Sequence, residues 1–283
     1  MLNPNPNNKN AKLLGRIGYL NVLPIYHALE SGAIKHGYQL YYGPPASLNT
    51  AMEQGRLVAS SCSCIEYARR PEQYFLLPRL AIGSVGAVQS VLMLSQVPIE
   101  KLKNETILVS AETHTSAMLL RLLLKERYKL NPNYEVGNAT ERVATAAPPL
   151  AFLAIGDEAM RLRKHPLYPY QLDLGEAWTS WTGLPCVFGV WVMNRNFQPD
   201  SKLEHPAIIL EKSRDWGIKN LDQILNIAEI NYPNLSRNEL IAYFKGLSYD
   251  LNEKEQEGLN LLYAKFAQAG FINQAPKLCF AQL

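Results

Sequence analysis

Residues 15–24 read GRIGYLNVLP, a short apolar run that ends in Asn21 and is followed by a proline. The pattern predicts a strand over Arg16–Leu20 and a helix from Pro24 to about Ser31, because proline is well tolerated in the first turn of a helix. In α/β proteins, ligands bind beyond the carboxyl ends of the strands. Asn21 therefore fits two roles equally well: a local turn or cap residue, or a neutral hydrogen-bonding group for a ligand.

The same alternation of strand and helix continues along the first third of the chain. Strands are predicted over Tyr38–Tyr42 and Leu57–Ser61, and helices over Leu48–Gln54, with Ser47 as N-cap, and from Ser63 to about Ala68. Strands that alternate with helices are typical of a mostly parallel sheet covered by helices. The chain is therefore predicted to be an α/β protein.

A second lobe is predicted in the middle of the chain. Strands are expected over Thr106–Val109 and Leu150–Ile155, with an apolar helix over Thr115–Tyr128 between them. We expect the chain to cross between lobes near Pro98 and to return along the strand Cys186–Met193. Residues 1–96 and 194–283 then form the first lobe, with a helical C-terminus, and residues 97–193 form the second, with a cleft between them.

Hydroxyl side chains gather where predicted strands turn into helices. Ser63 stands at one such point, and Thr113, Thr115 and Ser116 cluster at another, with His114 among them as a loop residue rather than a catalyst. The start of a helix carries free N–H groups and the positive end of the helix dipole, so it can bind a carboxylate. One cap needs only one hydroxyl, and the second cluster therefore favours anion binding over capping.

Two further stretches place small or acidic residues beside the cleft. The apolar segment 81–95 contains Ser84, Gly86 and Ser90, where a ligand could approach the backbone; a bulge or hinge is the alternative. Asp157 follows Gly156 at the end of a predicted strand, and capping of the next helix is its favoured role.

Composition limits the classes of function. The chain has 283 residues and a net charge of +3, which suits an anionic small molecule. No basic stripe with interleaved aromatic residues indicates a nucleic-acid partner, and no apolar run approaches the ~20 residues that span a membrane. The Asn- and Pro-rich first dozen residues are expected to be disordered and lack the pattern of a secretory signal, so a cytoplasmic location is expected.

Cysteine and histidine spacing argues against metal or disulfide sites. Cys62 and Cys64 form a CxC pair rather than a zinc-type CxxC, and with Cys186 and Cys279 they are expected to be free thiols. No two histidines are four residues apart, so no metal site is expected. Neither GxGxxG, Walker A nor GxSxG occurs, which argues against nucleotide binding and serine hydrolysis.

Eight ordered blocks between Arg16 and Asn194 resemble the chorismate dehydratase family, enzymes of menaquinone synthesis by the futalosine route. They read GYLNVLPIY, ASLNTAMEQG, SCIEYARRPE, LPRLAIGSVGAVQSVLMLS, ETHTSAMLLRLLL, AIGDEA, LDLGEAW and TGLPCVFGVW. The resemblance implies the two-lobed fold of type II periplasmic binding proteins, with mixed sheets flanked by helices. It also implies loss of water from chorismate, with no metal or organic cofactor.

The resemblance implies roles for particular residues. Asn21 and Ser90 would be catalytic, and the substrate-binding residues would be Tyr19, Ser63, Cys64, Ser84, Gly86, Thr115, Ser116 and Asp157. The Ser63 side and the Thr115–Ser116 side would each hold one of the two carboxylates of chorismate. Two positions depart from the family pattern, because Val58 stands where Asp is usual and Cys64 stands where a second Ser is common.

Three alternatives to this activity stay open at the level of sequence. A non-enzymatic protein that binds a small carboxylate would use the same fold, since a fold does not determine a function. The related 1,4-dihydroxy-6-naphthoate synthase shares the fold but takes a larger aromatic substrate. A diverged, inactive homologue is the third alternative. The sequence also leaves the oligomeric state open, and a homodimer is one of the alternatives.

Overall fold

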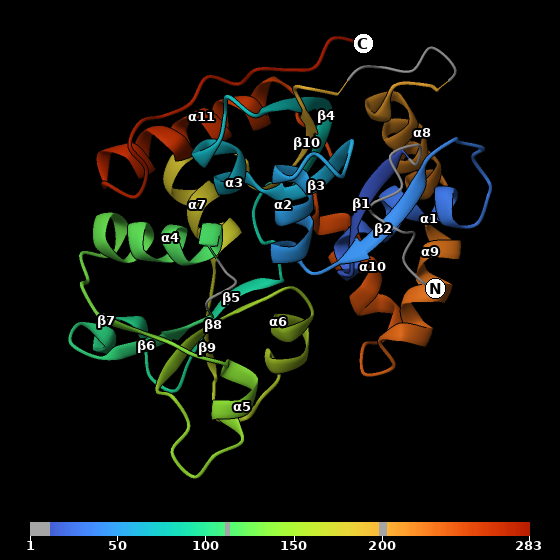
Figure 1. The fold of residues 1–283 in the computed structure, drawn as a ribbon. Coiled ribbons are helices and arrows are strands. Elements are labelled where there is room, and N and C mark those ends of the chain that lie inside the picture. Colours follow the sequence, from blue (N-terminus) through green and yellow to red (C-terminus); the bar gives the residue numbers. More distant parts are fainter. Residues whose placement is uncertain (1–11, 111–113, 198–202) are drawn as a thin grey trace.

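The computed structural model describes residues 12–110, 114–197 and 203–283, which form two five-stranded sheets flanked by helices (Figure 1). The first sheet has the order β2-β1-β3-β10-β4. Its strands are β1 (Leu13–Ile17), β2 (Gln39–Gly43), β3 (Ala59–Ser63), β4 (Tyr74–Ser84) and β10 (Cys186–Asn194). β1 is parallel to β2 and β3, whereas β10 is antiparallel to β3 and β4, so the sheet is mixed.

The second sheet has the order β7-β6-β8-β5-β9 and is also mixed. Its strands are β5 (Val91–Ser95), β6 (Thr106–Val109), β7 (Asn133–Val136), β8 (Ala151–Ile155) and β9 (Tyr170–Asp173). β6 is parallel to β7 and β8, and β5 is antiparallel to β8 and β9. Two α/β lobes with mixed sheets are therefore confirmed.

Helices connect the strands and cover the sheets. In the first lobe they are the short 3₁₀ helix η1 (Leu20–Val22), α1 (Leu23–Glu30), α2 (Pro45–Glu53) and α3 (Cys64–Arg69). In the second they are η2 (Ile99–Leu102), α4 (His114–Leu122), the π-helical turn η3 (Leu123–Arg127), α5 (Ala139–Val143), α6 (Gly156–Leu162) and α7 (Leu174–Thr182). The C-terminal helices are α8 (Pro206–Lys219), α9 (Leu221–Asn231), α10 (Arg237–Gly246) and α11 (Glu253–Gln268), and they flank the first lobe in Figure 1.

The chain crosses between the sheets before β5 and again before β10. The predicted boundaries at residues 96/97 and 193/194 put β5 in the first lobe and β10 in the second, and the strand pairing reverses both assignments. Every residue of β5 is buried. A continuous apolar strand fits the interior of either sheet, so hydrophobicity alone does not distinguish them.

The carboxylate of Asp173 holds the first crossing in place. It accepts hydrogen bonds from the backbone N–H groups of Val88 (3.0 Å) and Gln89 (2.7 Å), which lead into β5, and from those of Gly175 and Glu176 at the start of α7. Gln89 has a φ of 62°, a strained value for a residue other than glycine. One half-buried side chain thus joins the crossing to a helix start.

Several local predictions are refined by the structure. The first strand begins three residues earlier than predicted, and Ser47 lies inside α2, whose N-cap is Pro44. Capping boxes, which depend on residues three positions apart, begin α10, with Ser236 and Glu239, and α11, with Asn252 and Glu255. The four cysteines are free thiols.

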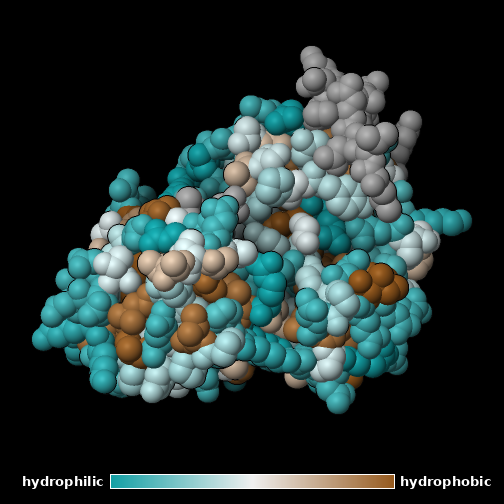
Figure 2. Space-filling view, turned by 90° about the horizontal axis from the view of Figure 1, so that it is seen from below, coloured by the Kyte–Doolittle hydropathy of each residue, from teal (hydrophilic) through white to brown (hydrophobic). Residues whose placement is uncertain are grey.

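Hydrophilic side chains cover most of the face shown in Figure 2, with hydrophobic groups scattered among them. None of the helices in the described ranges is long and apolar enough to cross a bilayer. The predicted disorder of the first dozen residues falls almost wholly outside the described ranges, as does Thr113.

Candidate functional site

A cavity of about 240 Å³ lies between the two lobes, where strands end and helices begin. The first lobe contributes η1 with the preceding Tyr19, residues of α2, the end of β3 and the middle of β10. The second lobe contributes the starts of α4 and α6, and the segment entering β5 completes the wall. Helix starts carry the positive end of the helix dipole, and this end favours the binding of anions.

Six of the ten predicted site residues line this cavity. They are Tyr19, Asn21, Ser63, Ser90, Thr115 and Ser116. These residues come from four separate segments of the chain, so the fold brings together what the sequence only suggests. The predicted location of the site, between the lobes at the ends of strands, is where the cavity lies.

Asn21 presents an unsatisfied amide to the site. Its Oδ1 atom is buried and accepts no hydrogen bond from any described residue. A buried polar atom without a partner costs about 1–3 kcal/mol of folding free energy. Because Asn21 lines the cavity, a ligand that donates a hydrogen bond to this oxygen, or a bound water, would remove that cost. The ligand-binding role of Asn21 is therefore favoured over the turn role.

The starts of α3 and α4 meet across the lobes. Thr115 Oγ1 accepts a hydrogen bond from the backbone N–H of Ile65 at 3.3 Å, and lies 3.7 Å from the sulfur of Cys64. Thr115 therefore caps a helix of the opposite lobe. Ser63 is the N-cap residue of α3, but its side chain makes no capping hydrogen bond. Its hydroxyl and the proton of Thr115 are thus placed to bind a ligand.

This contact changes the predicted arrangement of the two hydroxyl groups. We expected Ser63 and the Thr115–Ser116 pair to hold one carboxylate each. The hydrogen bond between Thr115 and Ile65 instead brings both helix starts to the same end of the cavity. Together they suit one shared carboxylate, and a second polar group of the ligand would then face Asn21 and Ser90.

Replacing Thr115 by valine tests this contact between lobes. Thr115→Val keeps the shape of the side chain but removes the oxygen, so the N–H of Ile65 loses its cap. We expect the free energy of unfolding to fall by about 1 kcal/mol, as on loss of other helix caps. Urea denaturation followed by circular dichroism measures this. Thr50→Val is the control, because the Thr50 hydroxyl bonds only within α2, to the Ala46 carbonyl; an equal loss in both variants would contradict the proposed cap.

Ser90 is held in the cavity wall by two neighbours. Its hydroxyl accepts a hydrogen bond from Tyr243 of α10 at 3.2 Å and donates to the carbonyl of Val88 at 3.4 Å. Burial raises the pKa of Tyr243, so its phenol stays protonated and remains a donor. Ser90 is therefore fixed in orientation before any ligand binds.

Four predicted site residues do not line the cavity. Ser84 and Gly86 belong to the crossing itself, where Ser84 donates to the carbonyl of Gly86 and the Gly86 N–H donates to Thr179. Cys64 is fully buried behind Thr115. Asp157 bonds Leu20 and Tyr232 with its two oxygens. Sequence placed these residues near the site, but their polar groups face other parts of the protein.

The two departures from the family pattern lie away from the cavity lining. Val58 is buried, and its backbone is paired with Leu13 and Asn194 in the first sheet. Cys64 touches Thr115 rather than the cavity. Burial raises the pKa of the Cys64 thiol to about 12, so it stays protonated. Neither substitution changes a group that lines the cavity.

Sequence reasoning missed several lining residues, of which Trp191 is the largest. Trp191 is fully buried, and its Nε1–H donates to the hydroxyl of Tyr26 at 2.9 Å. It stands in an apolar strand pattern, which does not separate it from ordinary core residues. The other missed lining residues include Asn49, Cys62, His114 and Phe188.

The described lining of the cavity contains no Asp, Glu, Lys or Arg side chain. His114 is exposed at its edge, and its pKa is lowered by burial and by the positive charge of Arg69. Burial raises the pKa of the Cys62 thiol. At neutral pH the described lining therefore carries no charged group: apolar side chains make up most of it, and hydroxyl and amide groups lie among them. Within the described ranges, no cluster of three His, Cys, Asp or Glu could hold a metal ion.

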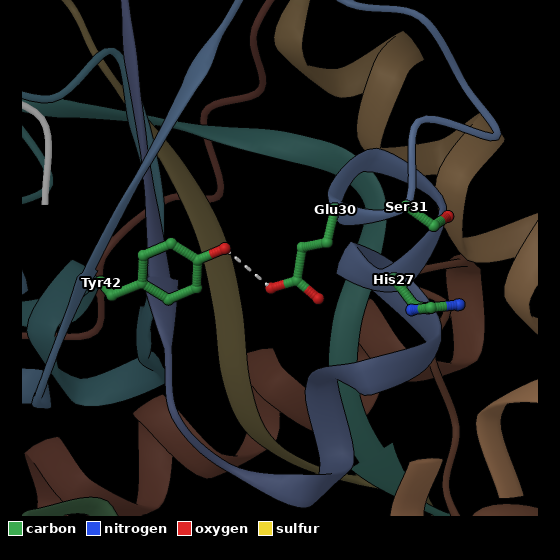
Figure 3. A pocket seen from close by; sticks show the side chains of 4 residues that line it. All are labelled: His27, Glu30, Ser31 and Tyr42. Carbon is green, nitrogen blue, oxygen red and sulfur yellow. Dashed lines mark hydrogen bonds between the residues drawn. The ribbon is translucent and has the colours of Figure 1, made fainter. Parts of the chain in front are cut away.

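A second pocket lies on the outer side of the first lobe and lacks these features. Figure 3 shows that it is lined by His27, Glu30, Ser31 and Tyr42, from α1 and β2 and the residue after α1. The Tyr42 hydroxyl donates to Glu30 at 3.1 Å, and Arg16 pairs with the same carboxylate at 2.9 Å. Its charged group is thus already paired within the protein, so the cavity between the lobes is the better candidate.

Comparison with other proteins identifies the family of the chain. The profile of a family described as Menaquinone biosynthesis matches residues 13–268. A chorismate dehydratase from Thermus thermophilus is 28% identical over 281 residues, which cover 93% of this chain and 97% of that protein. A chorismate dehydratase from Campylobacter jejuni is 27% identical over 246 residues, which cover 81% of this chain and 93% of that protein.

Solved structures support the predicted fold. The periplasmic aliphatic sulphonate-binding protein of Escherichia coli superimposes with a TM-score of 0.63 at 12% identity, covering 97% of this chain and 93% of its own. A Candida albicans protein described as having the generic periplasmic binding protein fold gives 0.65 at 10% identity, covering 96% and 98%. The chain thus has the two-lobed type II periplasmic-binding-protein-like fold.

Proposed function

Because the chain belongs to the menaquinone biosynthesis family, we propose that it is a chorismate dehydratase, which removes water from chorismate to give 3-[(1-carboxyvinyl)oxy]benzoate. The observation that carries this proposal is the lining of the cavity. Helix starts from both lobes and uncharged hydrogen-bonding side chains lie around one cavity, among apolar side chains. Such a site binds carboxylates through N–H and hydroxyl groups.

The size of the cavity also supports this substrate. Its volume of about 240 Å³ lies below the ~300–1,000 Å³ of pockets for drug-sized ligands. A single six-membered ring with small substituents suits such a space better than a larger aromatic substrate. This favours chorismate over the substrate of 1,4-dihydroxy-6-naphthoate synthase.

The reaction is an elimination that the substrate itself assists. The C–H bond at the ring carbon bearing the ether breaks, and its electron pair forms the new ring double bond. The neighbouring C–O bond breaks, and hydroxide leaves with a proton as water. The ring becomes aromatic, which drives the reaction. Because no carboxylate lines the described cavity, we assign the proton transfer to the enolpyruvyl carboxylate of chorismate.

The protein's part is to hold this reactive conformation. The hydroxyls of Ser63 and Thr115 would bind the ring carboxylate, and Asn21 and Ser90 would orient the enolpyruvyl carboxylate and the leaving hydroxyl. Fixed geometry of this kind lowers the activation barrier without a protein base, because the reacting groups are already aligned when the substrate is bound.

The experiment that tests the proposal needs only purified protein and chorismate, without an added cofactor. We expect the ultraviolet absorbance of the cyclohexadiene to disappear and the product mass to be that of chorismate minus one water. Tight binding with unchanged chorismate would instead favour a carboxylate-binding protein, and neither binding nor turnover would reject chorismate as ligand.

The assignment of the base has its own test. Glu112 lies outside the described residues and is the carboxylate nearest in sequence to Thr115. Substrate assistance predicts that Glu112→Gln keeps kcat within about threefold, whereas loss of a general base costs ~10²–10⁴-fold. A loss of that size in Glu112→Gln would mean that a protein base, and not the substrate carboxylate, accepts the proton.

Ser90→Ala tests the orientation of the reacting groups. Removing the hydroxyl takes away a fixed hydrogen bond and leaves Tyr243 without its acceptor. We expect kcat to fall by about tenfold, the effect of losing one hydrogen bond of ~1.4 kcal/mol in the transition state. Steady-state kinetics with chorismate measures this. A rate equal to that of the unaltered protein would show that Ser90 only packs the wall.

A further inference from the structure

The carboxylate of Asp157 joins three parts of the chain that are far apart in sequence. Asp157 lies in the first turn of α6, in the second lobe. Its Oδ2 accepts a hydrogen bond from the hydroxyl of Tyr232 at 2.7 Å, and its Oδ1 accepts one from the backbone N–H of Leu20 at 3.4 Å. Leu20 stands between Tyr19 and Asn21, which both line the cavity.

The C-terminal helices reinforce this contact. Arg163 and Lys164, just after α6, each lie 2.8 Å from Glu239 of α10. Partly exposed ion pairs of this kind contribute little each. The bond of Tyr232 to Asp157 is more sheltered and charge-assisted, and such bonds are the stronger class. The end of α9 and the start of α10 thus hold the second lobe against the first.

We propose that Asp157 and Tyr232 form a latch that keeps the cleft closed over the cavity and fixes the turn that carries Asn21. The latch spans the two lobes, because the carboxylate belongs to the second lobe and accepts hydrogen bonds from Leu20 and Tyr232, which both lie with the first lobe. Asp157 is then a positioning residue, not a group that touches substrate. The effect of the latch on kinetics with chorismate rests on the proposed function, whereas its effect on the closure of the two lobes does not.

Loss of the latch should lower the fraction of molecules that are closed. Apparent affinity falls by the same factor as the population of the competent state. A hydrogen bond to a charged group contributes enough that its removal changes such an equilibrium by roughly tenfold or more. Bound substrate still favours closure, so the chemical step after binding should be little affected.

The test uses Tyr232→Phe, Asp157→Ala and the double variant, with Tyr168→Phe as the matched control. Tyr168 is a buried tyrosine whose hydroxyl also accounts for one hydrogen bond, but it donates to the Pro149 carbonyl within the second lobe. Small-angle X-ray scattering without ligand should show a larger radius of gyration for the three latch variants only. Hydrogen exchange should show faster exchange of the Leu20 amide in the same three.

Kinetics with chorismate should show KM raised about tenfold in Tyr232→Phe, with kcat within about threefold, the pattern of lost uniform binding. The double variant should add little to either single variant, because the partners act as one unit. Unchanged scattering and exchange in variants that circular dichroism shows to be folded would overturn the latch. Failure of the proposed function would instead appear as no turnover in the unaltered protein, with the scattering difference intact.

Discussion

Asn21→Ala is expected to lower kcat for chorismate dehydration by at least ~100-fold, as loss of a preorganised hydrogen-bonding group does in other enzymes. Asn21 lines the cavity with a buried amide oxygen that no described residue satisfies. An amide oxygen of this kind is available to accept a hydrogen bond from a reacting group. Chorismate binding should be largely retained, because the helix starts of α3 and α4 are untouched.

Two companion variants make this result specific. Asn49→Ala removes another amide of the same cavity, on α2, and should change KM more than kcat. Asn21→Asp keeps the shape but places a negative charge beside a dianionic substrate, so KM should rise as well. Single-turnover kinetics and calorimetric titration separate binding from chemistry. An Asn21→Ala variant with unchanged kcat would remove Asn21 from the mechanism.

Trp191→Ala should cause the largest loss of stability among the variants considered. Trp191 is fully buried in β10, and it packs against Tyr26 with a ring separation of 6.4 Å. Truncation of a buried tryptophan costs about 3–5 kcal/mol, because apolar contacts are lost and a void remains. For a chain of this size we expect the melting temperature to fall by about 10 °C.

Trp191→Phe separates the two causes of that loss, which are lost packing and a lost hydrogen bond. This variant keeps most of the ring but loses the Nε1–H that donates to Tyr26, so about 1 kcal/mol should be lost. Thermal and urea denaturation measure both variants. A nearly equal loss in Trp191→Phe would mean that the hydrogen bond, rather than packing, dominates. A loss below 1 kcal/mol in Trp191→Ala would contradict its role as the packed floor of the cavity.

Local patterns in the sequence were enough to predict the two-lobed α/β fold and most of the helix starts. Thr106–Val109 is a strand with the predicted bounds, and both capping boxes form, because each depends on residues only a few positions apart. The hydroxyl clusters at Ser63 and Thr115 also predicted cavity residues, since a helix start must satisfy its free N–H groups locally.

The pairing of distant segments could not be predicted in the same way. Strands β5 and β10 lie in the opposite sheets from those predicted, because both have apolar patterns that fit either interior. For the same reason Trp191 could not be told apart from an ordinary core residue. The sequence likewise placed Ser84, Gly86 and Asp157 at the site, whereas the folded chain directs their polar groups elsewhere.

The sequence by itself thus determined the elements, their order and the polar residues that stand at the ends of strands. Only the tertiary structure decided that Thr115 caps α3 in the other lobe, that Asp157 bonds Tyr232, and that the Asn21 oxygen is buried without a described partner. The physical reason is the distance along the chain over which each interaction acts. Capping and periodicity act over a few residues, whereas hydrogen bonds between lobes depend on how two whole sheets and the C-terminal helices pack.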